Sequence, residues 1–134
     1  MRYLTIDQVI ELHDRVLSEH GGAAGIRSHH GLAYAVAAPQ QTAFGEDAYP
    51  TLADRAAALG FFITMNHPFL DGNKRTGLAA LETFLELNGF FLASDDDVVV
   101  DVFERLAGGE MEAAVFFTWV AAHVAPLPTA DDER

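Results

Sequence analysis

The segment 67–77, HPFLDGNKRTG, constrains the fold more than any other part of the chain, because it places polar and charged side chains between two apolar runs. The runs, residues 59–65 and 78–87, have the composition of helices that pack into a core. Small or flexible residues would be expected between two ordinary helices. This junction instead holds an imidazole, a carboxylate, an amide, an ammonium and a guanidinium. The chain is therefore predicted to join two buried helices through a turn that carries chemistry.

The second half of this segment predicts an anion site. Gly72 and Asn73 permit a tight turn with unusual backbone angles, and a helix is expected from Lys74 onward. A helix that begins after a glycine turn leaves backbone N–H groups unpaired at the positive end of its dipole, where phosphate groups bind. Lys74, the only lysine of the chain, and Arg75 lie in this first turn. Positive side chains are mildly unfavourable there unless an anion lies between them.

The first half of the segment adds a base and a metal ligand. Asp71 offers a hard oxygen suited to Mg²⁺ that bridges phosphates, and His67 can act as a general base near neutral pH. Taken singly, His67 fits an ordinary loop histidine, residues 71–73 fit an ordinary turn, and Lys74 and Arg75 fit a solvated first turn of a helix. The conjunction predicts phosphoryl or nucleotidyl transfer. The spacing is neither that of a Walker A loop nor that of an H-E-x-x-H zinc pair.

Composition narrows the class of protein. A chain of 134 residues, half of them hydrophobic, is long enough for one domain with a core and too short for two. It has no cysteine, which excludes disulfides and thiol catalysis. No signal peptide or membrane-spanning run is visible, so a cytoplasmic location without membrane contact is expected. Eight basic against twenty acidic residues give a net charge of −12, which argues against direct nucleic-acid binding.

Apolar spacing and helix breakers predict an all-α fold, a compact single-domain bundle of helices with short connections. Residues 5–8 form a capping-box pattern that starts a helix ending at Gly21-Gly22. His13 lies on the apolar stripe of this helix, and we interpret it as a histidine hydrogen-bonded at the core edge in preference to a ligand. Further helices are expected over residues 32–38, from Thr51 to the motif, over 98–106 and over 111–124.

Several other features receive structural interpretations. His29-His30 is expected in an exposed loop, and residues 40–50 form the longest irregular stretch, where the packing role of Phe44 and Tyr49 is left open. Residues 95–97, three aspartates, are interpreted as a favourable helix start in preference to a metal site. Phe69 is expected to point inward and anchor the motif loop, and Trp119 to be buried in the last helix.

The motif resembles the signature of the Fic/Doc family, H-x-F-x-[DE]-G-N-[GK]-R-x-x-R, and most closely its Doc (death-on-curing) branch, H-x-F-x-D-x-N-K-R-T. Lys74 stands where adenylylating Fic enzymes carry a second glycine, and Leu78 where they carry a second arginine. Both departures are typical of Doc proteins. The resemblance extends over roughly residues 1–124, which gives a Fic/Doc domain over 1–125 and a short acidic tail over 126–134. It rests further on Gly21-Gly22, Gly25, Ile26-Arg27, Leu32, Ala35 and Pro39.

The resemblance implies an all-α Fic/Doc fold and transfer of the γ-phosphate of ATP to a Ser or Thr hydroxyl of a protein. His67 would be the catalytic base and Asp71 the Mg²⁺ ligand. The backbone of Gly72 and Asn73, with the side chains of Asn73, Lys74 and Arg75, would bind the phosphates. The Doc branch implies a toxin that acts on translation elongation factor Tu and is restrained by a Phd-type antitoxin.

Two other functions remain open from the sequence. The same motif can transfer AMP, as a Fic-type adenylyltransferase does, although Lys74 and Leu78 count against this. The chain can also be a catalytically silent Fic-fold binding module, against which the intact His67, Asp71, Asn73 and Arg75 speak. Residues 42–47 come close to the inhibitory [ST]-x-x-x-E-[GN] motif of Fic enzymes. We interpret this as coincidence, because the stretch contains Gly45 and is predicted to be a loop.

Overall fold

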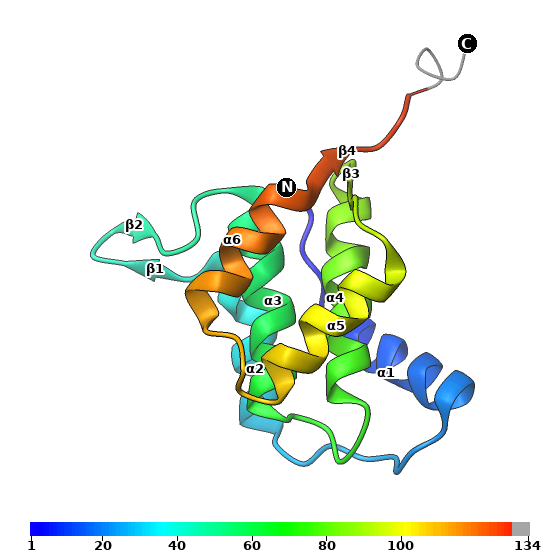
Figure 1. The fold of residues 1–134 in the computed structure, drawn as a ribbon. Helices are drawn as coiled ribbons and strands as arrows, with labels where there is room; N and C mark the ends of the chain where they lie inside the picture. The colour runs from blue at the N-terminus through cyan, green and yellow to red at the C-terminus, as the bar shows by residue number, and fades with distance from the viewer. Residues whose placement is uncertain (130–134) are drawn as a thin grey trace.

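Residues 1–129 are described by a computed structural model, in which helices dominate (Figure 1). The predicted all-α fold is confirmed. The α-helices are α1 (Ile6–His20), α2 (His29–Ala37), α3 (Leu52–Asn66), α4 (Asn73–Leu87), α5 (Asp96–Ala107) and α6 (Ala113–His123). A short 3₁₀ helix, η1 (Ala38–Gln40), follows α2. The strands are short and form two antiparallel pairs, β1 (Thr42–Ala43) with β2 (Glu46–Asp47), and β3 (Phe90–Leu92) with β4 (Val124–Pro126).

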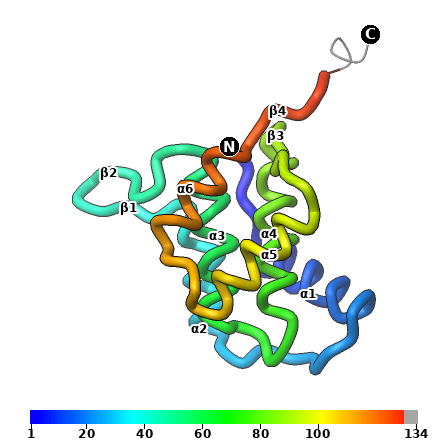
Figure 2. The backbone as a smooth tube through the Cα atoms, viewed as in Figure 1, coloured from blue at the N-terminus to red at the C-terminus, as the bar shows by residue number. Residues whose placement is uncertain are grey.

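The helices α3 and α4 form the centre of the bundle, as the backbone trace shows (Figure 2). α3 packs against α2, α4, α5 and α6, while α4 also contacts α1 and β3. The core between them is made of fully buried apolar side chains, among them Leu59, Ile63, Leu81, Phe84 and Leu85. The motif loop connects these two central helices, so the packing that forms the core also determines where the loop lies.

Local signals in the sequence account for the starts of α1, α3 and α5. The Thr5 side chain accepts a hydrogen bond from the Gln8 backbone, and the Gln8 side chain accepts one from the Thr5 backbone, which completes the predicted capping box of α1. Thr51 caps α3 by accepting from the Asp54 N–H. Asp96 and Asp97 lie in the first turn of α5, as expected for a favourable helix start.

Three helices differ from their expected bounds, and one of them, α5, runs from Asp96 to Ala107 where 98–106 was expected. α2 begins at His29, because the Ser28 hydroxyl accepts from the Gly31 N–H and caps a turn that was expected to be loop. His29 and His30 are nevertheless exposed, as predicted. α6 ends at His123, since the following residues pair with β3. The expectation that Trp119 is buried is wrong: its ring is half-buried and stacks on His123, with ring centroids 4.6 Å apart.

The stretch 40–50 forms a small hairpin from β1 and β2. Phe44, at its tip, has a left-handed backbone (φ 54°) and a fully exposed side chain, so it is not a packing residue. Tyr49 does pack, with its ring 5.7 Å from that of Phe117. Residues 42–47 form this hairpin and not the helix from which the inhibitory motif of Fic enzymes acts, so their likeness to that motif is a coincidence of sequence.

The C-terminal strand ties the end of the domain to the turn after α4. β4 runs to Pro126, and the Leu127 N–H donates to the Gly89 carbonyl at 2.9 Å. Backbone pairing therefore continues slightly past residue 125, where the domain was expected to end. The acidic part of the expected tail, residues 130–134, lies outside the described residues. Within residues 1–129, no helix has the length and apolar character needed to cross a membrane.

The close approach of α3 and α4 depends on glycine. A Cβ built on Gly77 would meet the Thr64 hydroxyl oxygen and would lie 2.9 Å from the Gly60 carbonyl oxygen. Gly60 is under a milder constraint from the other side, since a Cβ there would lie 3.0 Å from the Leu81 side chain. The Thr64 hydroxyl is itself buried without a hydrogen-bond partner. The two helices can therefore cross at this distance only without a side chain at Gly77, while a side chain at Gly60 would require Leu81 to shift.

Gly77→Ala is predicted to destabilise the protein by about 1–3 kcal/mol, because the added methyl group overpacks the crossing and outweighs the gain in helix propensity. Chemical denaturation measures the change. In a Thr64→Ala background the penalty should be smaller, since the nearest colliding atom is gone. A Gly77→Ala protein as stable as the wild type would contradict this account of the crossing.

Candidate active site

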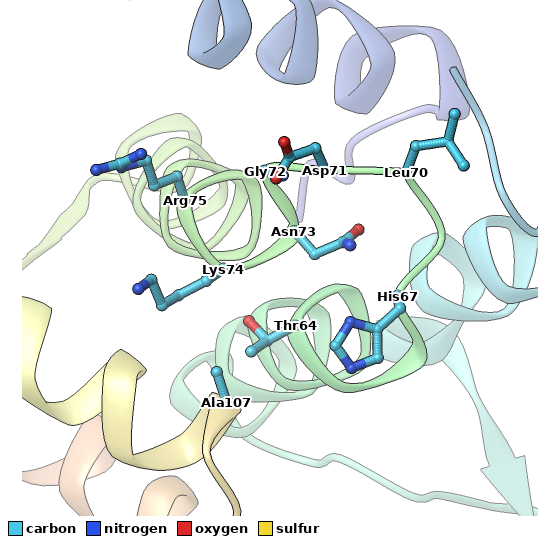
Figure 3. A pocket seen from close by; sticks show the side chains of 9 residues that line it. All are labelled: Thr64, His67, Leu70, Asp71, Gly72, Asn73, Lys74, Arg75 and Ala107. Atoms are coloured by element: carbon cyan, nitrogen blue, oxygen red, sulfur yellow. The ribbon is translucent and has the colours of Figure 1, made fainter. Parts of the chain in front are cut away.

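His67 ends α3 in a strained conformation. It has a left-handed backbone (φ 48°, ψ 55°), which is uncommon for any residue but glycine. Such strain costs on the order of 1–3 kcal/mol and tends to occur at functional sites. The reversal in backbone direction stops the helix and leaves the side chain exposed. Figure 3 shows the imidazole at the last turn of α3, beside Thr64.

A hollow of about 380 Å³ opens at this end of the bundle. The sequence-predicted residues all line it (Figure 3): His67, Asp71, Gly72, Asn73, Lys74 and Arg75. Sequence reasoning missed Thr64, Leu70 and Ala107. Thr64 lies one helical turn before His67, a spacing that could have indicated it. Ala107 comes from the end of α5, and no sequence pattern connects it with the motif.

The start of α4 has the backbone geometry expected of an anion site. Gly72 is the N-cap residue, with a left-handed backbone (φ 76°), and no side chain caps this end of the helix. The Gly72 N–H is already used, because it donates to the Asp71 carboxylate at 2.9 Å. The N–H groups available to a ligand therefore begin at Asn73, within the first turn of the helix.

Asn73 holds the motif loop closed. Its side-chain oxygen accepts from the Phe69 N–H at 2.9 Å, and its amide group donates to the Phe69 carbonyl at 3.0 Å. Both ends of this side chain are thus engaged with the backbone of one residue four positions earlier. The sequence suggested a phosphate contact for this side chain, whereas the structure gives it a role in shaping the loop.

Phe69 anchors the loop in the core, as predicted, and is only 1% exposed. The segment after α1 supports the loop from outside: the N–H groups of Arg27 and Ser28 donate to the Pro68 carbonyl, and the Leu70 N–H donates to the Gly25 carbonyl. Arg27, whose role the sequence left open, contributes through its backbone and has an exposed side chain. The loop is thus clamped between the core and this segment.

Asp71 carries the carboxylate expected to bind a metal ion. Its Oδ1 accepts from the Gly72 N–H, its Oδ2 accepts from the Ala23 N–H at 3.3 Å, and its side chain is exposed. Among residues 1–129, no cluster of three or more metal-ligating side chains exists. A single oriented carboxylate fits Mg²⁺ carried in with phosphates, because this ion takes few protein ligands and keeps its remaining sites for phosphate oxygens and water.

The two cations of the first turn behave differently. The Lys74 ammonium lies 3.8 Å from the Glu104 carboxylate of α5, and the Lys74 side chain remains partly exposed. Arg75 is exposed, and in Figure 3 its guanidinium extends away from His67. Both side chains lie at the rim of the hollow, so both can swing toward an anion bound at the helix start.

A second hollow of about 350 Å³ lies beside the first, between α1, α4 and α5. We call it the acidic groove; its lining residues are Val16, Glu19, His20, Lys74, Arg75, Leu78, Ala79, Glu82, Val100, Phe103 and Glu104. Glu82 keeps solvent contact, yet partial burial raises its pKa, and the charges of Glu86 and Asp96 raise it further. The groove combines an apolar floor with carboxylates and shares Lys74 and Arg75 with the first hollow.

Asn73→Asp is predicted to lower the free energy of unfolding by about 1–3 kcal/mol, because a carboxylate oxygen would face the Phe69 carbonyl where an amide now donates. It should also weaken nucleotide binding, which is measured by calorimetry. Asn88→Asp is the matched control: Asn88 bonds the backbone of Arg2 and Phe84 at the far end of α4. This control should lose stability and keep nucleotide affinity. Equal loss of affinity in both variants would contradict a local role for Asn73.

Comparison with known proteins agrees with this geometry. A family model described as Fic/DOC family matches residues 3–85. The Toxin Doc of Mycolicibacterium smegmatis (strain ATCC 700084 / mc(2)155) is 53% identical over 78 residues, which cover 58% of this chain and 60% of that protein. The Protein kinase doc of Escherichia phage P1 is 30% identical over 114 residues, or 85% of this chain and 89% of that protein.

The match to the first relative thus spans about 60% of that protein's length, while the second relative is matched over most of its length. The family model covers more than half of the 134 residues and includes the whole motif, of which His67 and every residue from Leu70 to Arg75 line one hollow. On these grounds the chain belongs to the Fic/DOC family.

Proposed function

We propose that this protein is a Doc-like toxin that transfers the γ-phosphate of ATP to a Ser or Thr hydroxyl of a target protein, with translation elongation factor Tu as the proposed target. The observation that carries the proposal is one hollow that His67, at the end of α3, lines together with Asp71, Lys74 and Arg75 around the start of α4. A base, a carboxylate and an uncapped helix start are the parts that phosphoryl transfer requires.

In the proposed reaction His67 takes the proton from the target hydroxyl, whose oxygen attacks the γ-phosphorus. The bond from that phosphorus to the bridging oxygen breaks, and ADP leaves. The first-turn N–H groups of α4, with Lys74 and Arg75, stabilise the charge on the phosphates. Asp71 would hold Mg²⁺, which supplies further charge neutralisation when bound. Asn73 contributes by keeping the loop in shape.

Two residues favour kinase activity over adenylylation. Lys74 replaces the second glycine of the adenylylating pattern, and Leu78 replaces its second arginine. Leu78 faces the acidic groove, so no second guanidinium is offered to a nucleotide from that position. The names of the two relatives, Toxin Doc and Protein kinase doc, support the toxin and kinase parts of the proposal. Adenylylation and a silent binding module remain the alternatives that the experiment separates.

We also propose an antitoxin partner of the Phd type, whose flexible segment folds onto the toxin. The acidic groove supports this, because a basic amphipathic segment would match its apolar floor and the carboxylates of Glu19, Glu82 and Glu104. An occupant there would lie against Lys74 and Arg75 and hinder nucleotide access. The net charge of −12 is consistent with a protein partner and argues against direct nucleic-acid binding. Because the proposed reaction uses ATP and a translation factor, we propose that it occurs in the cytoplasm.

The transfer reaction is tested with elongation factor Tu, Mg²⁺ and ATP labelled at either the γ- or the α-phosphate. Label is expected on the target from γ-labelled ATP alone. His67→Ala should reduce transfer by about 10²–10⁴-fold, the usual contribution of a general base. Label from the α-phosphate would establish adenylylation instead.

The same reactions on whole-cell lysate serve as the control for target choice. A labelled lysate protein with no labelling of elongation factor Tu would replace the proposed target and keep the kinase activity. Absence of label in both, with toxicity retained by His67→Ala, would identify a silent binding module.

The partner is tested by co-expressing the toxin with the reading frame that neighbours it. Co-expression is expected to relieve growth arrest, and the double variant Glu19→Lys with Glu82→Lys should escape this relief while remaining toxic, because the charge of the groove is reversed. Glu11→Lys, an exposed position of the same α1 helix outside the groove, is the matched control. Equal neutralisation of the double variant and the wild type would place the partner elsewhere.

A further inference from the structure

His13 lies one layer behind the hollow and has no assigned role in the proposed reaction. It belongs to α1, far from the motif in sequence, and its side chain is only 3% exposed. A buried histidine carries polar nitrogens that must be satisfied, so its partners are informative. Its Nε2 lies 2.8 Å from the backbone carbonyl oxygen of Asp71.

The direction of this hydrogen bond follows from its acceptor. A carbonyl oxygen can only accept, so Nε2 carries the hydrogen and donates it. The bond joins α1 to the backbone of the residue whose carboxylate is the expected metal ligand. His13 is thus a side chain from outside the motif that makes a direct hydrogen bond to Asp71.

The same ring is held in place by the motif itself. His13 and Phe69 stack face to face, with ring centroids 3.8 Å apart and planes inclined by only 6°. Phe69 is in turn held through its backbone by Asn73. The imidazole therefore cannot rotate away without opening the core, and its N–H stays directed at Asp71.

Asp71 is consequently fixed at three atoms. His13 donates to its carbonyl oxygen, Gly72 to its Oδ1 and Ala23 to its Oδ2. Two of these donors, His13 and Ala23, come from α1 and the segment that follows it. A metal-binding carboxylate loses affinity when the groups that orient it are removed, typically by 10–100-fold.

We propose that His13 is a positioning residue that orients Asp71 for Mg²⁺ through its Nε2–H donor. The inference rests on the proposed function, in which Asp71 holds the ion with the nucleotide phosphates. It adds a residue from α1, outside the motif, to the determinants of metal affinity. Stacking against Phe69 keeps the ring in place, and the hydrogen bond sets the direction of the loop backbone at Asp71.

The test measures binding of a non-hydrolysable ATP analogue by calorimetry across a range of Mg²⁺ concentrations. His13→Phe keeps an aromatic ring for the stack and removes the donor, whereas His13→Gln keeps a donor and removes the ring. His13→Phe should need about 10-fold more Mg²⁺ for half-maximal binding, with its affinity for the metal-free analogue unchanged. His13→Gln should restore a near wild-type Mg²⁺ requirement.

His123→Phe is the matched control, because His123 also bonds a backbone carbonyl, that of Trp119 at 2.7 Å, away from the hollow. It should leave the Mg²⁺ requirement unchanged. A wild-type requirement in His13→Phe would overturn the inference alone. So would equal losses in His13→Phe and His13→Gln, since packing would then be responsible. Wild-type binding that does not depend on Mg²⁺ would overturn the metal role of Asp71 and the inference with it.

A measurement on the wild type covers the case in which His13→Phe does not fold. The Nε2–H resonance of His13 should shift when Mg²⁺ is added to the nucleotide complex, while the ring resonances of His123 should not. An unchanged His13 resonance under saturating Mg²⁺ would overturn the proposal.

Discussion

The arrangement of the site depends on the burial of one aromatic side chain, Phe69. Its ring is removed from water and packs against His13 of α1 in the core. Burying an apolar side chain of this size stabilises a fold by about 1.5–3 kcal/mol. The cost of burying the adjoining backbone is offset by Asn73, which satisfies both the N–H and the carbonyl of Phe69. Every functional group of the motif is within a few residues of this anchor, so the site inherits the rigidity of the core.

Two residues with a left-handed backbone conformation shape the site on either side of Phe69. His67 reverses the chain at the end of α3, and Gly72 reverses it again at the start of α4. Glycine adopts the second conformation without strain, whereas histidine adopts the first at a cost. The costly conformation occurs where the imidazole at the end of α3 lines the same hollow as the start of α4. The tight crossing at Gly60 and Gly77 keeps those ends close enough for one substrate.

The sequence allowed prediction of those features that depend on neighbours along the chain. It allowed prediction of the contiguous motif, the capping box at Thr5 and the inward position of Phe69, because spacing and residue type determine these features locally. The ion pair between Lys74 and Glu104, the contribution of Ala107 and the bond from His13 to Asp71 were not. These contacts depend on how α1 and α5 pack against α4, and no local pattern encodes that packing. Trp119 was mispredicted for a related reason: α6 is apolar on all sides, so its sequence does not indicate which face is buried.

The charge of the protein and the charge of its site act on different length scales. A net charge of −12 would repel a nucleic acid, whose binding needs many phosphate contacts spread over the surface. At physiological ionic strength, charges more than about 8 Å away are largely screened. A single nucleotide at the start of α4 would instead respond to the nearby N–H groups, Lys74 and Arg75. With its only lysine at this helix end, an acidic protein that binds a nucleotide there, as proposed, would select one small anion while rejecting polyanions.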